Sequence, residues 1–173
     1  MKRVANFEKV SFEQFKKDCE KNNLTFDSED KLREVYESIP LPQRGTKFSA
    51  GYDFTSPFTR TFCKGDSIII PTGIRCSMNN DWVLMLYPRS GLGFKYHIGL
   101  ANTVGVIDSD YYDSDNEGHI MVKLDNNGND NILIHKGDKF VQGVFTQYGI
   151  TWDDDIETSR NGGLGSTGRW FIS

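Results

Sequence analysis

The sequence lacks paired cysteines, long apolar runs and an excess of basic residues, and each lack argues against a class of protein. Its 173 residues include 3 cysteines, Cys19, Cys63 and Cys76. An odd number of widely spaced cysteines argues against a disulfide framework or a zinc knuckle and predicts reduced thiols. We therefore expect a cytoplasmic protein.

The sequence also argues against membranes and nucleic-acid polymers as partners. The longest apolar runs, Ile68–Ile70 and Val83–Tyr87, are far too short to cross a bilayer, and no apolar stretch follows the basic start as in a signal peptide. The formal net charge is −4, whereas binding to a nucleic-acid backbone usually needs a basic face. An acidic protein can still bind one nucleotide where a few cations and backbone N–H groups gather.

What is present is the composition of a globular domain, with 37% apolar and 25% charged residues. Residues 11–39 have a helical pattern. Ser11 and Gln14 form a capping box, Asp27 can cap a second segment, and Pro40 ends it. Two interpretations stand: short amphipathic helices docked on a core, or an arm that binds a partner.

The rest of the chain has the pattern of short strands separated by clusters of Gly, Asn, Asp and Pro. Strands at this spacing, without helices between them, predict a β-sandwich or jelly roll. The expected strands are Ser67–Ile74, Trp82–Tyr87, Ile98–Asn102, His119–Leu124, Asn131–Ile134 and Phe140–Tyr148.

The stretch Tyr87-Pro-Arg-Ser-Gly-Leu-Gly93 suits a phosphate. Arg89 supplies forked donors, Ser90 supplies a hydroxyl, and Gly91 lets the main chain approach. A surface turn with an exposed arginine is the alternative for such a short match.

The stretch from Ala101 to Tyr111 carries more chemistry. Asn102 can donate and accept, as a base edge requires, and Gly105 allows a tight hairpin. Asp108 and Asp110 form an acidic pair that would share one face of a strand, and one of them can act as a general base. The alternative is a turn with two solvated aspartates.

The stretch Arg160-Asn-Gly-Gly-Leu-Gly-Ser-Thr-Gly168 combines glycines, hydroxyls and a cation. Successive N–H groups of such a segment can form an anion nest, although it is not a Walker A loop. A disordered tail is the alternative.

In order and spacing, these pieces resemble the five motifs of the trimeric dUTPases, including members from Gram-positive bacteria and their phages. The resemblance covers about residues 41–168. The matching stretches are Ala50-Gly-Tyr-Asp-Phe54, Pro88-Arg-Ser-Gly91, Gly105-Val-Ile-Asp-Ser-Asp-Tyr111, Gly137-Asp-Lys-Phe-Val-Gln142 and the tail from Arg160.

The resemblance implies an all-β protein, a dUTPase-like jelly-roll β-barrel with a short helical N-terminal extension. The implied division is an extension over 1–40, a barrel over 41–159 and a Gly-rich lid over 160–173. The implied activity is the Mg²⁺-dependent hydrolysis of dUTP to dUMP and pyrophosphate by a homotrimer with shared active sites. This activity keeps uracil out of DNA and supplies dUMP for thymidylate synthesis.

The resemblance also assigns roles to residues. Asp108 is implied as the base that activates the attacking water, and Asp53 as a Mg²⁺ contact through water. Tyr111 is implied to lie under the deoxyribose and exclude a 2′-hydroxyl. The implied substrate-binding residues are Arg89, Ser90, Gly91, Asn102, Gly105, Val106, Ile107, Tyr111, Met121, Gln142, Arg160, Leu164, Gly165 and Ser166.

The chain departs from the family pattern in three places. Leu164 stands where the family has an aromatic residue over uracil, the helical region before Pro40 is longer, and Tyr112–Glu117 adds an acidic turn. That turn is interpreted either as a solvated loop or as a recruiter of Mg²⁺.

Two other functions compete with dUTP hydrolysis. A dCTP deaminase shares the fold but needs a glutamate near the base's C4, where this sequence has Lys123. A nucleotide-binding regulatory protein would keep the pocket without catalysis, which the intact Asp53, Arg89, Asp108 and Arg160 argue against.

Overall fold

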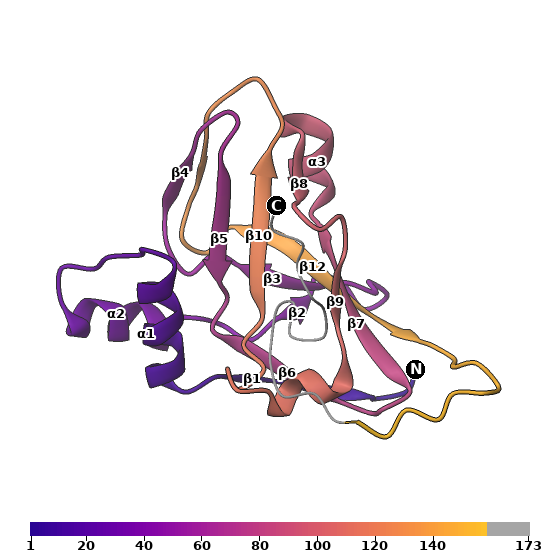
Figure 1. Ribbon diagram of the computed structural model, residues 1–173. Coiled ribbons are helices and arrows are strands. Elements are labelled where there is room, and N and C mark those ends of the chain that lie inside the picture. The colour runs from indigo at the N-terminus through magenta and orange to yellow at the C-terminus, as the bar shows by residue number, and fades with distance from the viewer. Residues whose placement is uncertain (159–173) are drawn as a thin grey trace, which may run out of the picture.

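The protein is mostly β, and its largest sheet runs through the middle of the molecule (Figure 1). The structure is a computed structural model that describes residues 1–158. Neighbouring strands of this sheet are antiparallel. In spatial order its strands are β2 (Gln43–Arg44), β3 (Tyr52–Thr55), β12 (Lys139–Gln147), β7 (Trp82–Pro88) and β9 (Gly105–Ile107).

Smaller antiparallel sheets complete the β structure. One contains β5 (Ser67–Pro71), β10 (Met121–Asn126) and β8 (Ile98–Leu100). The others are the pairs β1 (Ala5–Lys9) with β6 (Ile74–Met78), and β4 (Arg60–Phe62) with β11 (Ile132–Ile134). The helices are α1 (Phe12–Lys21), α2 (Glu29–Glu37), α3 (Ser90–Tyr96) and the 3-10 helix η1 (Ser109–Asp113).

One hydrophobic core joins the N-terminal helices to the sheets. On β10, buried Val122 and Leu124 flank exposed Lys123, the period-two alternation of a strand with one face inside. Phe15 of α1 is as fully buried as Phe62 of β4, and both belong to the same buried cluster. Residues on either side of position 40 therefore share their packing.

The predicted helices are confirmed, but both caps differ in part from the prediction. The Gln14 side chain does not complete the capping box, because its amide donates to Asp18, and the N–H of Ser11 donates to Glu117. Ser11 Oγ accepts the N–H of Gln14, as expected. The second cap is Ser28, not Asp27, because Ser28 has the extended backbone of a cap and its hydroxyl accepts the N–H of Lys31.

Each expected strand segment contains a strand, but one segment holds two. The predicted strand Ser67–Ile74 divides into β5 and β6, because Gly73 turns the chain with φ +74°. Strands β1, β2, β3, β4 and β9, helix α3 and the 3-10 helix η1 were not predicted, and β6 was predicted only at its first residue. Helix α3 makes the chain mostly β rather than all-β.

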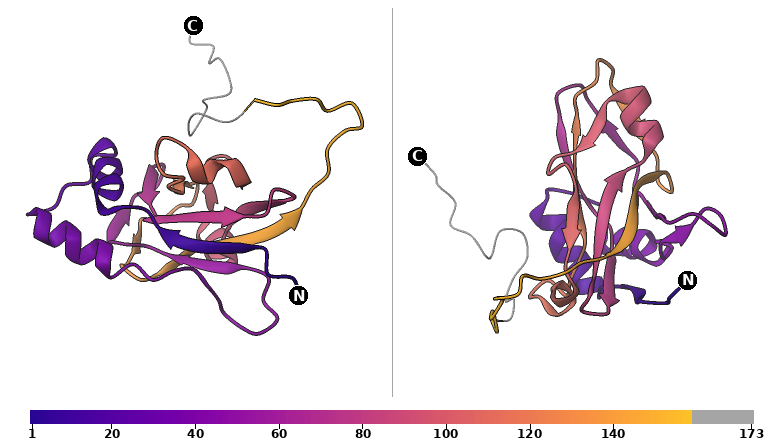
Figure 2. Two further views of the ribbon diagram at one scale, coloured as in Figure 1. Left: turned by 90° about the horizontal axis from the view of Figure 1, so that it is seen from below. Right: turned by 90° about the vertical axis from the view of Figure 1, so that its right-hand side faces the viewer.

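The N-terminal helices and the last described residues lie at opposite ends of the molecule. In Figure 2, left, α1 and α2 lie at one end, and the chain beyond β12 extends past the other end. That extension carries exposed Ile150, Trp152 and Ile156.

Candidate active site

A buried carboxylate held between two cations forms the first half of the site. Strand β3 places Asp53 between Gln43 of β2 and Gln142 of β12. The Asp53 side chain is 4% exposed, with Oδ1 2.5 Å from Arg89 Nη1 and Oδ2 2.9 Å from Lys139 Nζ. Burying a carboxylate is costly unless it is paired, so these two ion pairs offset that cost and fix the Asp53 side chain in place.

Arg89 lies where β7 gives way to α3. Its backbone is extended, with φ −67° and ψ 137°, and the helix begins at Ser90. Ser90 and Gly91 are exposed, and a Cβ added at Gly91 would meet no atom within 4 Å. A guanidinium carries five N–H donors, so the pair with Asp53 leaves others for a ligand. The open backbone and free donors fit an anion.

Strand β12 brings Gln142 and Lys139 to the same place. Gln142 lies opposite Asp53 on one side and Tyr87 on the other. The register shifts between Lys139 and Val141, a bulge that changes which way β12 side chains point. A Cβ at Gly51 would lie 2.5 Å from Gln142 Oε1, so glycine is needed there for the amide to approach.

These residues line a cavity of about 510 Å³. Its wall combines two cations, one carboxylate, one amide and hydroxyl groups, a polar set suited to an anionic ligand. The lining residues are Gly45, Thr46, Ser49, Ala50, Gly51, Asp53, Tyr87, Arg89, Lys139, Gln142 and Val144.

The loop between β8 and β9 forms the second half of the site. It links the sheet of β5, β10 and β8 to the large sheet, and it exposes Asn102. The left-handed residue of this loop is Thr103, with φ +65°, a conformation that β-branched residues rarely adopt. Gly105 was expected to make the tight turn. It lies instead in β9, where a Cβ would come within 3.0 Å of Leu86 Cβ.

The acidic pair does not lie on a strand, the condition under which its two carboxylates were expected to share a face. Strand β9 ends at Ile107, Asp108 is the extended residue before η1, and Asp110 lies inside that helix. The two carboxylates therefore do not share a strand face. Val106 is 54% exposed, and Ile107 and Asp108 are half-buried, so the end of β9 is open to a ligand.

Tyr111 is fixed by hydrogen bonds on both sides of its hydroxyl. The side chain is buried, its Oη donates to the carbonyl of His119 at 2.9 Å, and it accepts from Asn116 Nδ2 at 2.9 Å. Met121 lies at the start of β10, opposite Pro71, and is half-buried.

The described part of the chain does not unite these two halves in one cavity. Asp53, Arg89 and Gln142 come together, but the residues from Asn102 to Tyr111 and Met121 do not line their cavity. Ser90 and Gly91 adjoin it through Arg89. The predicted residues Arg160, Leu164, Gly165 and Ser166 lie outside the described residues.

Sequence reasoning missed Lys139. Its signal was its place within Gly137-Asp-Lys-Phe-Val-Gln142, the fourth motif, but lysines are common on exposed strand ends. The ion pair with Asp53 is what distinguishes it.

The metal-ligating side chains within residues 1–158 do not form a metal site by themselves. No group of three or more His, Cys, Asp or Glu side chains in this range is placed to hold a metal ion. Asp53 is a single carboxylate with a cation on each oxygen. Within the same range, no helix is long and apolar enough to span a membrane.

Comparison with known proteins gives consistent matches. A family model described as dUTPase matches residues 37–168. A deoxyuridine 5'-triphosphate nucleotidohydrolase of Lactococcus lactis is 41% identical over 133 residues, 75% of this chain and 89% of the relative. A protein of the same name from Escherichia coli is 34% identical over 143 residues, 78% of this chain and 91% of the relative.

A solved structure agrees with these matches. The crystal structure of dUTPase from Streptococcus mutans superposes with a TM-score of 0.63 at 30% identity, covering 84% of this chain and 98% of that one. These findings confirm the resemblance drawn from the motifs, including the likeness to Gram-positive members.

Proposed function

The chain belongs to the dUTPase family and is a hydrolase that converts dUTP to dUMP and pyrophosphate, and from that premise we propose which of its residues carry out each step. The observation that carries the proposal is the cavity in which Asp53, Arg89 and Lys139 form a charged group beside Gln142. A triphosphate needs such a local excess of cationic donors in an otherwise acidic protein.

The triphosphate binds in the Asp53 cavity. The guanidinium of Arg89, the ammonium of Lys139, the Ser90 hydroxyl and the main chain at Gly91 bind phosphate oxygens. Gln142 positions a phosphate or the attacking water through its amide. Asp53 holds both cations in place before the substrate arrives, so little reorganisation is needed on binding.

The residues fit a Mg²⁺ ion that arrives with the triphosphate rather than one resident in the protein. Mg²⁺ typically keeps several waters and is held by one or two carboxylates plus substrate phosphates. Asp53 is the carboxylate placed to contact such waters. When bound, the ion neutralises charge on the phosphates.

The loop between β8 and β9, together with β9 itself, recognises the base. Asn102 and the backbone of Gly105, Val106 and Ile107 pair with the uracil edge, and Tyr111 lies under the deoxyribose. A cytosine presents the wrong donors and would leave polar groups unpaired, which is costly in a desolvated site. Met121 completes the substrate contacts.

Asp108 is the general base. It removes a proton from a water molecule whose oxygen attacks the α-phosphorus in line with the leaving group. The bond between the α-phosphorus and the bridging oxygen breaks, and pyrophosphate leaves with that oxygen.

The separation of the two halves supports a shared site. One copy supplies the Asp53 cavity and another the Asp108 segment, in a homotrimer of jelly-roll barrels with the helical extension over 1–40. The segment 160–173, with Arg160, Leu164, Gly165 and Ser166, closes over the triphosphate as a lid on the barrel of residues 41–159. The enzyme acts in the cytoplasm, keeps uracil out of DNA and supplies dUMP for thymidylate synthesis.

A pyrophosphate-release assay with dUTP, UTP and dCTP, run beside an assay for ammonia, tests this proposal. We expect pyrophosphate from dUTP in strong preference to the other two nucleotides. Ammonia from dCTP would instead establish the deaminase, and nucleotide binding without any product would establish the regulatory protein.

A further inference from the structure

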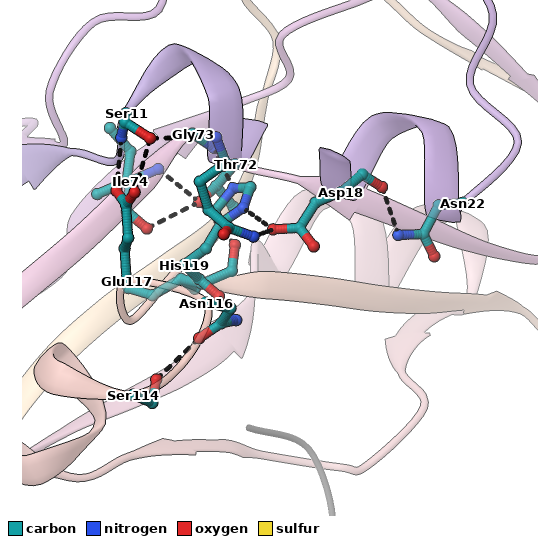
Figure 3. Close-up of polar contacts among 12 residues, drawn as sticks. Ser11, Asp18, Asn22, Thr72, Gly73, Ile74, Ser114, Asn116, Glu117 and His119 are labelled. Atoms are coloured by element: carbon teal, nitrogen blue, oxygen red, sulfur yellow. Dashed lines mark hydrogen bonds and ion pairs between the residues drawn. The ribbon is translucent and has the colours of Figure 1, made fainter. Parts of the chain in front are cut away.

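Two of the departures from the family pattern contact each other. The N-terminal segment (residues 5–37) lies against the turn (residues 112–119), which consists of the acidic turn Tyr112–Glu117 and the two residues after it. Figure 3 shows the turn directly beneath α1, with polar contacts running between them. The contacts join residues about a hundred positions apart in the sequence, for example 106 positions between Ser11 and Glu117. The turn begins at the residue after Tyr111.

The first contact is at the start of α1. Glu117 Oε2 accepts the backbone N–H of Ser11 at 2.7 Å, and Oε1 accepts its hydroxyl at 2.6 Å. Glu117 thereby takes the part that a capping box gives to Gln14, whose amide bonds to Asp18 instead. Glu117 is therefore half-buried, and both of its carboxylate oxygens are hydrogen-bonded to the start of α1.

The backbone of the turn supports this assignment. Glu117 has φ +57°, a left-handed conformation that a non-glycine residue adopts at a cost. The next residue, Gly118, also has positive φ, and a Cβ there would lie 2.7 Å from the Cα of Tyr112. The two hydrogen bonds to Ser11 offset the cost of holding Glu117 in this geometry.

The second contact is buried. His119 is fully buried, and its Nε2 accepts the N–H of Gly73 at 2.8 Å, so the ring proton lies on Nδ1. Nδ1 donates to Asp18 Oδ2 of α1 at 2.6 Å, and the same oxygen accepts from Gln14 Nε2 at 2.7 Å. Asp18 therefore fixes the orientation of the imidazole.

The third contact comes from β1. Glu8 Oε2 accepts from the hydroxyl of Tyr112 at 2.7 Å and pairs with Arg75 at 3.0 Å. Arg75 in turn lies over the Tyr112 ring, 4.3 Å from its centroid. The residue that directly follows Tyr111 is thus tied to the N-terminal strand.

These contacts converge on Tyr111. Its hydroxyl bonds to the carbonyl of His119 and to Asn116, both within the turn. The side chain of His119 is held by Asp18, and the neighbouring Glu117 by Ser11. Any movement of α1 away from the turn removes partners from the residues that hold the tyrosine.

We propose that the N-terminal segment is a brace for the sugar-binding tyrosine, and that Asp18 and His119 are positioning residues that set the selectivity for deoxyribose over ribose. The inference rests on the proposed role of Tyr111. Selectivity against ribose requires a Tyr111 ring that does not move aside for a 2′-hydroxyl. The Tyr111 hydroxyl is held by residues of the turn, and the N-terminal segment holds the turn itself, so the ring meets this requirement.

The test compares the ratio of kcat/KM for dUTP to kcat/KM for UTP in Asp18→Ala and Asp18→Asn. Both substrates are measured on one preparation, so a loss of folded enzyme lowers both rates equally and cancels in the ratio. We expect Asp18→Ala to lower the ratio by roughly tenfold, the value of a lost buried hydrogen bond. Asp18→Asn should restore most of it, because an amide oxygen can accept the same two hydrogen bonds.

Matched controls separate the brace from general damage to α1. Glu20→Ala removes an exposed carboxylate from the same helix and should leave the ratio unchanged. Ser11→Ala and Ser28→Ala each remove a helix cap, but only Ser11 contacts Glu117. Should Asp18→Ala fail to fold, a lower ratio in Ser11→Ala than in Ser28→Ala supports the brace, and equal ratios overturn it.

Tyr111→Ala distinguishes failure of this inference from failure of the proposed function. A reduced ratio in Tyr111→Ala with an unchanged ratio in Asp18→Ala overturns the brace alone. An unchanged ratio in Tyr111→Ala overturns the role of the tyrosine in selectivity and the brace with it.

Discussion

At the scale of single residues, the charged group around Asp53 shows what motifs can and cannot reveal. Asp53, Arg89 and Gln142 were predicted from short matches and lie together at the cavity. Lys139 was not predicted, because its partner comes from a strand far earlier in the chain. A pairing between distant strands depends on sheet register, which no local pattern records.

Lys139→Met tests the missed residue. It removes one of the two cations on Asp53 while keeping most of the side chain's length, so the triphosphate and the buried carboxylate each lose a partner. Loss of a charge-assisted hydrogen bond costs about 1.5–3 kcal/mol, which corresponds to roughly a 10- to 100-fold fall in kcat/KM for dUTP. Steady-state kinetics give this value directly.

Lys136→Met is the matched control, because Lys136 is an exposed lysine on the turn before β12 and does not line the cavity. Equal kinetics in the two variants would show that Lys139 does not take part in substrate binding.

Thr103 supplies a second test at this scale. Its φ of +65° is strained for a β-branched residue, whereas asparagine tolerates the left-handed region. Thr103→Asn should therefore raise the free energy of unfolding by about 1 kcal/mol. A urea or thermal unfolding series measures the change, and a decrease in stability would contradict the assignment of strain to this loop.

At the scale of elements, the long periodic segments were predictable and the short ones were not. The caps and amphipathic spacing predicted α1 and α2, and the chain folds both helices as expected apart from two cap partners. Ser28 caps α2, and Glu117 takes the place of Gln14 at the start of α1. Helix α3 escaped prediction because Gly91 and Gly93 weaken its helical signal, and β9 because Gly105–Ile107 is too short to show alternation. Packing against β7 decides the structure of β9.

The contact between the N-terminal segment and the acidic turn predicts a pH dependence. Burial alone would raise the pKa of Glu117, but the hydroxyl and amide of Ser11 outweigh it and lower that pKa below its ordinary 4.5. The pKa of Glu8 is also lowered, chiefly by the hydrogen bond from Tyr112, with Arg75 contributing. Burial also opposes the shift at Asp18, yet the hydrogen bond from His119 and that from Gln14 leave its pKa below 3.8.

A carboxyl whose pKa is depressed in the folded state contributes stability that is present above its unfolded pKa and lost as pH falls through the folded one. The wild type should therefore lose stability as the pH falls below about 4.5 more steeply than Glu117→Gln, which has no charge to protonate at that position. Thermal unfolding across this range measures the two slopes. Parallel curves would mean that Glu117 makes no such contribution.

At the scale of the whole molecule, the motifs predicted the family and its chemistry but not how the parts combine. The order of five short matches was enough to identify a dUTPase, which the family model and the Lactococcus relative confirm. The extension and the acidic turn looked like separate departures, because their shared contacts join positions about a hundred residues apart. The hydrogen bonds between them appear only once the chain is folded.

We propose that each active site combines the Asp53 cavity of one copy with the Asp108 segment of another. Asp108→Asn alone should lower turnover by roughly 10²–10⁴-fold, the usual contribution of a general base. Arg89→Ala should likewise impair hydrolysis by removing a phosphate ligand. Each variant retains the half of the site that the other has lost.

A mixed oligomer shows whether the active site is shared. Asp108→Asn and Arg89→Ala subunits are co-expressed under different affinity tags, and the mixed oligomer is purified through both tags. In a shared site, an Arg89→Ala copy supplies an intact Asp108 segment to the intact cavity of an Asp108→Asn copy. The mixed oligomer should then hydrolyse dUTP far faster than either variant alone. A mixed oligomer no more active than its parents would place the whole site within one chain, and the active site would not be shared.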